Sequence, residues 1–268
     1  MKSHFQSFIR IVTAEIIKLK GTFAFWLTFL YPLGSVLLVS LIWYSQRNNK
    51  NINPNQFISN LSNAASFFLP FFIVLLISVA CNTEHKSAMM KHILALPIPR
   101  PLFYFGKFAG IMVFIALAFV LTLILAYCSL LLFGMVLPKL GFGSNFDHVL
   151  LFRAFFRVYL AASAIYPIQY WLGMRLKNLT LPVAIGSTLI ILPIAILIVL
   201  GIAGLMNNSN NFTQSLTYNP YSYPYSAAFS MMQNADFIIF PTLTLVYILI
   251  SFLALAFGAW DFSRKNAG

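Results

Sequence analysis

Six long apolar runs constrain the fold of this chain more than any other sequence feature. A helix crosses the hydrocarbon core of a bilayer with about 20 apolar residues, and each run is near or above that length. The runs lack the two-residue alternation of a membrane β-barrel strand, so we expect helices. The predicted spans are residues 23–44, 64–82, 105–133, 154–173, 179–206 and 237–260. The sequence therefore predicts an all-α integral membrane protein, with residues 1–268 forming a single six-helix transmembrane domain.

The composition excludes a soluble globular protein. Hydrophobic residues make up 60% of the chain and charged residues 8%, whereas soluble domains carry about 25% charged residues. The gaps between the predicted spans hold roughly thirty residues at most, fewer than the ~40 below which a domain rarely folds unaided. We therefore expect no separate soluble domain.

The formal net charge of +12 is distributed unevenly across the predicted membrane. Twelve basic residues flank the spans on one side and five on the other, and an excess of Lys and Arg marks the cytoplasmic side. Both termini are therefore expected to face the cytoplasm, and the basic pI indicates topology and anionic lipid rather than a nucleic-acid partner. The twelve are Lys2, Arg10, Lys18, Lys20, Lys86, Lys91, Arg100, Lys107, Arg175, Lys177, Arg264 and Lys265.

The first 22 residues are too polar to span a membrane, yet their apolar residues recur at spacings of three and four. These residues are Phe5, Phe8, Ile9, Val12, Ile16 and Leu19. This periodicity, with cations between, predicts an amphipathic helix lying in the cytoplasmic interface, with an elbow at Gly21. A frayed basic tail is the alternative.

Residues 207–235 carry no charge and are rich in Asn, Ser and Tyr. Tyrosine suits the headgroup zone of a bilayer, so we expect an external or re-entrant segment. Within the fourth predicted span, Gln169, Tyr166 and Ser163 are candidates for hydrogen bonds between helices.

Residues 84–101 form the longest charged interruption between two spans. On a helical wheel, one face is apolar and the other carries the polar and charged residues. Pro97, Pro99 and Pro101 then end the helix, because proline lacks a backbone N–H. We expect a short amphipathic coupling helix between the second and third spans, exposed to the cytoplasm, where a soluble partner can bind it. The alternative is a helix that lies on lipid headgroups.

The chain shows no pattern typical of an enzyme. Its five acidic residues lie in loops or at span ends, and the phosphate-binding GxxxxGK[ST] loop, HExxH and GxSxG are all absent. The four histidines are scattered, and Cys81 and Cys128 lie inside spans. We therefore expect no catalytic residue, no metal site and no bound cofactor. The glycines of Gly106-Lys107-Phe108-Ala109-Gly110 have the spacing that permits close helix packing.

Three patches of sequence resemble one family. They are Glu84 with Leu96-Pro97-Ile98-Pro99-Arg100 and Lys107; Gln169-Tyr170-Trp171-Leu172-Gly173-Met174-Arg175-Leu176-Lys177-Asn178; and the tyrosine–proline segment 219–224. Together with the topology, they resemble the membrane subunits of type-2 ABC exporters, in particular the lantibiotic-protection and bacitracin-resistance permeases. Lys86-Ser87-Ala88 and Pro99 stand where that family often has Gly-Thr and a small hydroxyl residue.

The resemblance implies a separate ATP-binding subunit, which uses ATP and Mg²⁺ and docks on the coupling segment. It also implies a second permease subunit, identical or similar to this one. The residues expected to contact the ATP-binding subunit are Glu84, His85, Met89, Met90, Lys91, Ile93, Leu94, Pro97 and Arg100. Secondary contacts are expected from Glu15, Lys18, Arg175 and Lys177.

The function we expect is that of a multi-pass permease subunit of an ATP-driven exporter in a bacterial plasma membrane. The uncharged spans suggest a hydrophobic substrate, and the resemblance implies an amphipathic peptide or lipid-like antibiotic, with resistance as the phenotype. A non-transporting scaffold or sensor subunit is the main alternative. An intramembrane lipid-modifying enzyme is disfavoured, because no nucleophile–base pair lies at a common depth.

Overall fold

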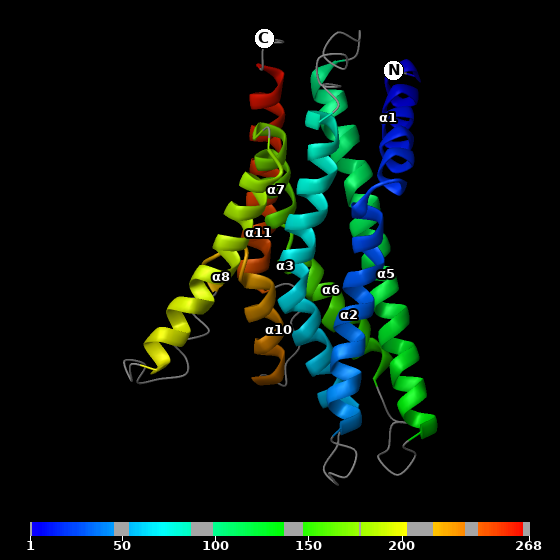
Figure 1. Ribbon diagram of the computed structural model, residues 1–268, viewed down its shortest axis with the longest axis vertical. Coiled ribbons are helices and arrows are strands. Elements are labelled where there is room, and N and C mark those ends of the chain that lie inside the picture. The colour runs from blue at the N-terminus through cyan, green and yellow to red at the C-terminus, as the bar shows by residue number, and fades with distance from the viewer. Residues whose placement is uncertain are drawn as a thin grey trace.

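The apolar runs fold as α-helices arranged around one long axis (Figure 1). The computed structural model describes residues 2–45, 54–86, 99–136, 147–176, 178–202, 217–233 and 241–264, and every regular element in these ranges is helical. The helices are α1 (Lys2–Lys20), α2 (Phe23–Ser45), α3 (Pro54–Lys86), α5 (Arg100–Val136), α6 (His148–Ala161), α7 (Ile165–Arg175), α8 (Thr180–Ile202), α10 (Tyr223–Gln233) and α11 (Thr242–Ser263).

Five stretches of the described chain are long and apolar enough to cross a membrane. They lie in α2, α3, α5, the consecutive helices α6 and α7, and α11, and so correspond to five of the six predicted spans. The remaining predicted span, 179–206, falls on α8, where the apolar stretch Thr180–Ile196 is shorter than the length that the other five reach. A multi-pass, all-helical membrane protein is therefore confirmed, whereas the count of six spans is not.

The fourth predicted span is two helices rather than one. Asp147 caps the N-terminus of α6 by accepting hydrogen bonds from the backbone N–H of Val149 at 2.8 Å and Leu150 at 3.1 Å. This cap explains why the helix begins before the apolar run does. A short turn between α6 and α7 then breaks the span near Ser163.

Helix α3 lies at the centre of the bundle. In the apolar stretch of α3, 67% of the residues are buried inside the protein, compared with 22% in α11 and 33% in α2. Helix α8 is the opposite case, since it diverges from the bundle (Figure 1) and exposes Ile191, Leu192 and Ile196.

Both chain termini lie at the same end of the bundle, shown at the top of Figure 1. We call this the terminal end. The last turn of α3, the first turn of α5 and the turn between α7 and α8 also lie there. The charge pattern predicted that these segments share one side of the membrane, and the fold brings them together.

Helix α1 occupies the segment for which we predicted an interfacial helix, and it ends before a turn at Gly21 and Thr22. Its direction differs from that prediction. It runs along the long axis of the bundle beside α5, nearly in line with α2, rather than across that axis (Figure 1). The physical reason is a close contact with two glycines of α5, which the next subsection describes.

The described part of segment 207–235 packs inside the protein. Helix α10 lies against α3 and α6, and Tyr221 and Tyr223 are only 1% and 3% exposed. Tyr223 shares a hydrogen bond of 2.7 Å with Thr244 of α11. These contacts place the described part of the segment among the other helices of the bundle.

Candidate coupling site at the terminal end

The predicted coupling residues divide into a described and an undescribed group. Met89, Met90, Lys91, Ile93, Leu94, Pro97 and Lys177 lie outside the described residues. Glu84 and His85 belong to the last turn of α3, and the structure describes only their backbone. The described side chains are those of Arg100, Arg175, Glu15 and Lys18.

Arg100 begins α5 and joins it to the end of α11. Its guanidinium donates a hydrogen bond of 2.9 Å to the backbone carbonyl of Ser263. A cation near the last carbonyls of a helix is favourable, because these carbonyls have no partner within the helix and carry partial negative charge. The end of the coupling segment is thereby tied to the last turn of α11.

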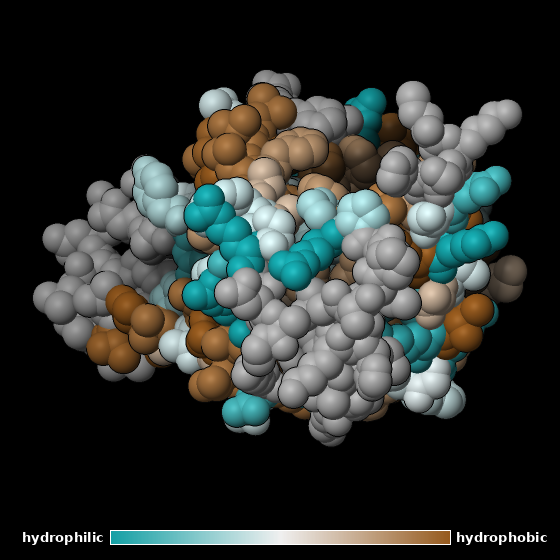
Figure 2. All heavy atoms as spheres, turned by 90° about the horizontal axis from the view of Figure 1, so that it is seen from above, coloured by the Kyte–Doolittle hydropathy of each residue, from teal (hydrophilic) through white to brown (hydrophobic). Residues whose placement is uncertain are grey.

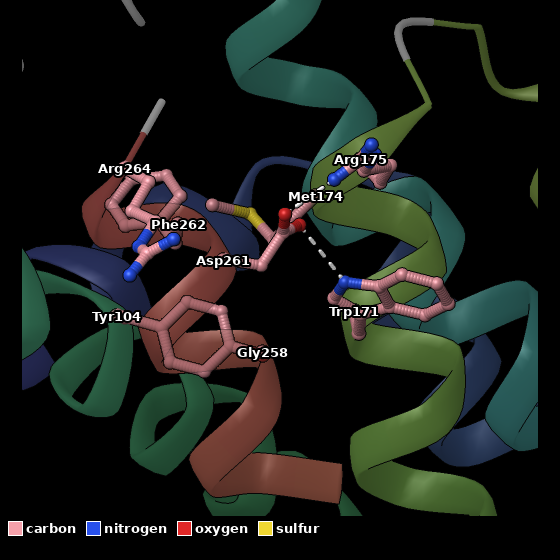
Figure 3. Close-up of a pocket in the computed structure, with 8 residues that line it drawn as sticks. All are labelled: Tyr104, Trp171, Met174, Arg175, Gly258, Asp261, Phe262 and Arg264. Atoms are coloured by element: carbon pink, nitrogen blue, oxygen red, sulfur yellow. Dashed lines mark hydrogen bonds and ion pairs between the residues drawn. The ribbon is translucent and has the colours of Figure 1, made fainter. Parts of the chain in front are cut away.

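Arg175 ends α7 and also binds α11. It forms an ion pair with Asp261, whose carboxylate accepts a further hydrogen bond of 3.0 Å from the indole N–H of Trp171 (Figure 3). Arg175 was a predicted site residue, but Asp261 and Trp171 were not predicted to act with it. Trp171 lies 90 positions and Arg175 lies 86 positions before Asp261 in the sequence, so no local sequence pattern predicts these contacts.

A cavity of about 280 Å³ lies between α5, α7 and α11 beneath this ion pair. The residues that line it are Tyr104, Trp171, Met174, Arg175, Gly258, Asp261, Phe262 and Arg264 (Figure 3). The Arg264 guanidinium lies 4.0 Å from the ring centre of Trp260, in cation–π geometry. The carboxylate in this cavity is already paired with Arg175, so we interpret the cluster as a joint between helices.

Glu15 lies inside the protein, which corrects the prediction that it forms a surface contact. It is 5% exposed, and its carboxylate lies 3.4 Å from the ammonium group of Lys107 and 3.3 Å from that of Lys18. Lys107 is fully buried and also donates to the backbone carbonyl of Ala80 in α3 at 3.4 Å. Helix propensity and amphipathic periodicity gave no indication of this ion pair, because it forms only when α1 packs on α5.

The two glycines predicted to permit close packing do so, and α1 is the helix that packs on them. A Cβ at Gly106 would lie 2.7 Å from Ile11, and one at Gly110 would lie 2.8 Å from Glu15. Contacts this short leave no space for a side chain. The two glycines therefore form the seat that holds α1 against α5.

The terminal end presents a basic surface. Its two described acidic side chains, Glu15 and Asp261, are both engaged in ion pairs, while Arg264 at this end and Arg10 and Lys20 along α1 are exposed. Seen from above, hydrophilic side chains gather near the middle of this face (Figure 2). An acidic protein surface or anionic lipid is the complementary partner.

Further into the bundle, Gln169 of α7 joins three other segments. Its amide donates to the Ser78 hydroxyl and to the Pro182 carbonyl, both at 3.0 Å, and accepts from the Tyr221 hydroxyl at 3.0 Å. Burial raises the pKa of Tyr221, so this phenol stays protonated and donates. The predicted role of Gln169 in hydrogen bonds between helices is confirmed.

Of the other two residues predicted for this role, Tyr166 also forms a hydrogen bond between helices, and the Ser163 side chain does not within the described chain. Tyr166 donates to the carbonyl of Tyr159 in the preceding helix at 2.9 Å. The Ser163 hydroxyl has no hydrogen-bond partner among the described residues. In the same part of the chain, no group of three or more His, Cys, Asp or Glu residues is placed to hold a metal ion.

The family model for ABC-2 family transporter proteins matches residues 11–193 of this chain. The match covers well over half of the 268 residues and includes both glycines of the α1 seat, Lys107 and Arg175. The chain belongs to the ABC-2 transporter family. Comparison with curated proteins finds no match. Membership identifies the chain as a permease, a membrane component of an ABC exporter without an ATPase site of its own, and it implies a partner ATP-binding subunit.

The matched range divides the candidate site. It contains the second half of α1, the coupling segment and the end of α7, whereas Asp261 of α11 and Arg264, which follows α11, lie beyond it. In this permease the segments from both sides of that boundary meet at the terminal end, through the contacts of Arg100 with Ser263 and of Arg175 with Asp261.

Proposed function

We propose that the permease exports an amphipathic peptide or lipid-like antibiotic, driven by a separate ATP-binding subunit that docks on the terminal end. The single observation that carries the docking site is the convergence of Arg100, Arg175 and Asp261 at that end. The contacts of these residues link the start of α5, the end of α7 and the end of α11. A force applied there reaches three membrane helices at once.

The coupling segment supplies the main contact in this proposal. An amphipathic helix exposed to water binds into an apolar groove of a partner, so Met89, Met90, Ile93 and Leu94 would face the ATP-binding subunit. Glu84, His85, Lys91, Pro97 and Arg100 would lie around them. The segment joins the central helix α3 to α5, so movement of the segment moves the core of the bundle.

The cations expected at the terminal end support an acidic partner surface. Lys18, Arg175 and Lys177 are the proposed secondary contacts, and Arg10 and Lys20 add to the same charge. We no longer assign Glu15 to this surface, because it is buried against Lys107. The terminal end then faces the cytoplasm of a bacterial cell, in accord with the excess of Lys and Arg there.

A second permease, identical or similar, completes the transport path. The divergence of α8 supports this pairing, since the helix leaves the bundle with Ile191, Leu192 and Ile196 exposed. Two-fold symmetry is the commonest arrangement of homo-oligomers. We therefore expect two bundles to enclose a path between them.

An apolar groove supports the proposed class of substrate. A cavity of about 350 Å³ lies between α2 and α5, away from the terminal end. It is lined mainly by aliphatic residues, among them Leu33, Leu37 and Leu132, and its few polar residues include Ser40, Tyr44 and Ser129. Such a lining suits a hydrocarbon or apolar side chain attached to a polar group.

Two substitutions in the coupling segment test the docking proposal. Glu84→Lys reverses a charge, and Met90→Asp places a charge on the apolar face. We expect both variants to lose co-purification with the ATP-binding subunit, or to bind it without coupling its ATP turnover to export. Arg153→Glu is the control, because Arg153 is an exposed charge on α6, away from the terminal end. Wild-type assembly and coupling in both coupling variants would refute the assignment.

A further inference from the structure

The one buried carboxylate–ammonium pair between helices in the described chain joins α1 to α5. Lys107 is completely buried and Glu15 is 5% exposed, with 3.4 Å between ammonium and carboxylate. Burying two charges is costly, and removing one partner leaves the other uncompensated in an apolar environment. Such a pair therefore holds its two helices in one arrangement much more firmly than an exposed pair does.

We infer that Glu15 and Lys107 form a latch that fixes α1 on α5 and makes α1 move with the helix that follows the coupling segment. The inference deepens the proposed function, because it assigns two positioning residues that transmit movement from the coupling segment. Neither residue is proposed to touch substrate or nucleotide.

The glycine seat on α5 sets the position at which α1 packs along α5. Gly106 and Gly110 flank Lys107 on the face of α5 that receives Ile11 and Glu15. A Cβ at either glycine would come within 2.8 Å of a side-chain atom of α1, so Ile11 and Glu15 pack directly against the glycine backbone of α5. Sliding α1 by one residue would replace the glycine contacts with side-chain overlap. The ion pair and the glycine seat thus specify the same position.

Lys107 also connects the latch to the central helix. It donates to the carbonyl of Ala80 at 3.4 Å, so α1, α3 and α5 meet at a single ammonium group. Ala80 lies shortly before the end of α3 at Lys86, and Lys107 lies shortly after the start of α5 at Arg100. The two contacts therefore lie on either side of the coupling segment. Movement of that segment that shifts α5 against α3 must change the surroundings of Lys107.

Glu15 has a second cation within reach, which makes release possible. Lys18 lies one turn along α1, 3.3 Å from the same carboxylate, and its side chain is 22% exposed. If α1 separates from α5, Glu15 keeps Lys18 as a partner and gains water, whereas Lys107 loses its contact with Glu15. Glu15 therefore has a cation in either arrangement, and Lys107 holds Glu15 only while α1 is packed on α5.

A charge exchange tests the latch on the full-length permease. The single variants are Glu15→Gln and Lys107→Gln, and the exchange is Glu15→Lys with Lys107→Glu. The matched control is Lys18→Gln, which removes the intrahelical partner alone. Spin labels at Arg10→Cys and Leu132→Cys, in a Cys128→Ser background, report the distance between α1 and the far end of α5. All three labelled or replaced positions are exposed.

We expect a single narrow distance distribution in the parent and in Lys18→Gln, and a broad or bimodal distribution in both single variants. The exchange should restore the narrow distribution, which a merely destabilising substitution would not do. Melting temperatures in detergent should fall by about 10 °C in the single variants and recover in part in the exchange. Narrow distributions in both single variants, or a broad one in the exchange, would overturn the latch.

Different results would refute the docking proposal and the latch. With the ATP-binding subunit bound, the single variants should lose the link between ATP turnover and export, and the exchange should regain it. If the partner does not bind the terminal end at all, the proposed docking fails while the distance measurements still decide the latch. If the partner binds and coupling persists in every variant with a broad distribution, the latch does not transmit movement and the inference is wrong.

Discussion

At Gly258, α11 approaches α5 so closely that the position accepts no side chain. A Cβ there would overlap the Tyr104 hydroxyl and lie 2.9 Å from the ring carbon that bears it. The Tyr104 ring cannot easily move, since it is fully buried and packs on Tyr170 with 4.7 Å between ring centres. Gly258 has an ordinary helical backbone, so space, and not conformation, requires glycine here. At the scale of single residues, the rigid ring of Tyr104 restricts the neighbouring position, Gly258, to glycine.

We expect Gly258→Ala to lower the free energy of unfolding by about 1–3 kcal/mol, the usual cost of overpacking. Adding Tyr104→Phe should recover part of the loss, because it removes the nearest oxygen. Gly34→Ala is the control, since no other atom lies within 4 Å of its Cβ position. Thermal unfolding in detergent measures all three. Equal stability of Gly258→Ala and Gly34→Ala would contradict the close approach.

At the scale of elements, the broken and diverging helices are held by polar side chains inside the bundle. The carbonyl of Pro182, in the first turn of α8, accepts a hydrogen bond from the Gln169 amide, and Tyr221, in the segment before α10, donates to the same amide. In an apolar environment each such group needs a partner, because water is not available to replace it. Gln169 therefore fixes how α3, α7, α8 and α10 meet.

Gln169→Leu should unfold at a lower temperature than the parent, because it leaves the Tyr221 hydroxyl, the Ser78 hydroxyl and the Pro182 carbonyl without this partner. Each unsatisfied buried group costs about 1–3 kcal/mol. We also expect faster proteolysis of the segment around α10, measured by mass spectrometry. Ser187→Ala is the control, since the Ser187 hydroxyl bonds only to carbonyls of its own helix. Unchanged protection of α10 in Gln169→Leu would count against this role.

At the scale of the whole molecule, the two ends of the bundle have different chemistry. The terminal end gathers basic residues and ion pairs, whereas the groove between α2 and α5 is almost entirely apolar. In the proposed function, the first binds the energy source and the second receives the substrate. The long helix α5 joins the two, since it contains both Lys107 and the groove residue Leu132.

Filling the groove should block export without affecting docking. Leu37→Trp places a larger side chain in the groove, and we expect loss of efflux of an amphipathic peptide from cells or vesicles, with normal co-purification of the ATP-binding subunit. Leu249→Trp is the matched control, because Leu249 is exposed on α11 and does not line the groove. Export at the parent rate in Leu37→Trp would exclude this groove as the substrate site.

Local patterns predicted much of this protein. Continuous hydrophobicity determined the all-helical membrane fold, because only helices or closed barrels satisfy the backbone in lipid. The distribution of Lys and Arg predicted which segments share one end, and the spacing of Gly106 and Gly110 predicted a close helix contact. These properties depend on neighbours within a few residues, so they can be read along the chain.

Tertiary structure alone decided the partners of the charged residues. Glu15 lies 92 positions from Lys107, and Asp261 lies 86 from Arg175, so nothing in their local sequences links them. The amphipathic pattern of α1 is equally compatible with a lipid surface or a protein surface. The packing of α1 on α5 selects the protein surface, because α5 provides the glycine seat and a buried cation that pairs with the carboxylate of α1.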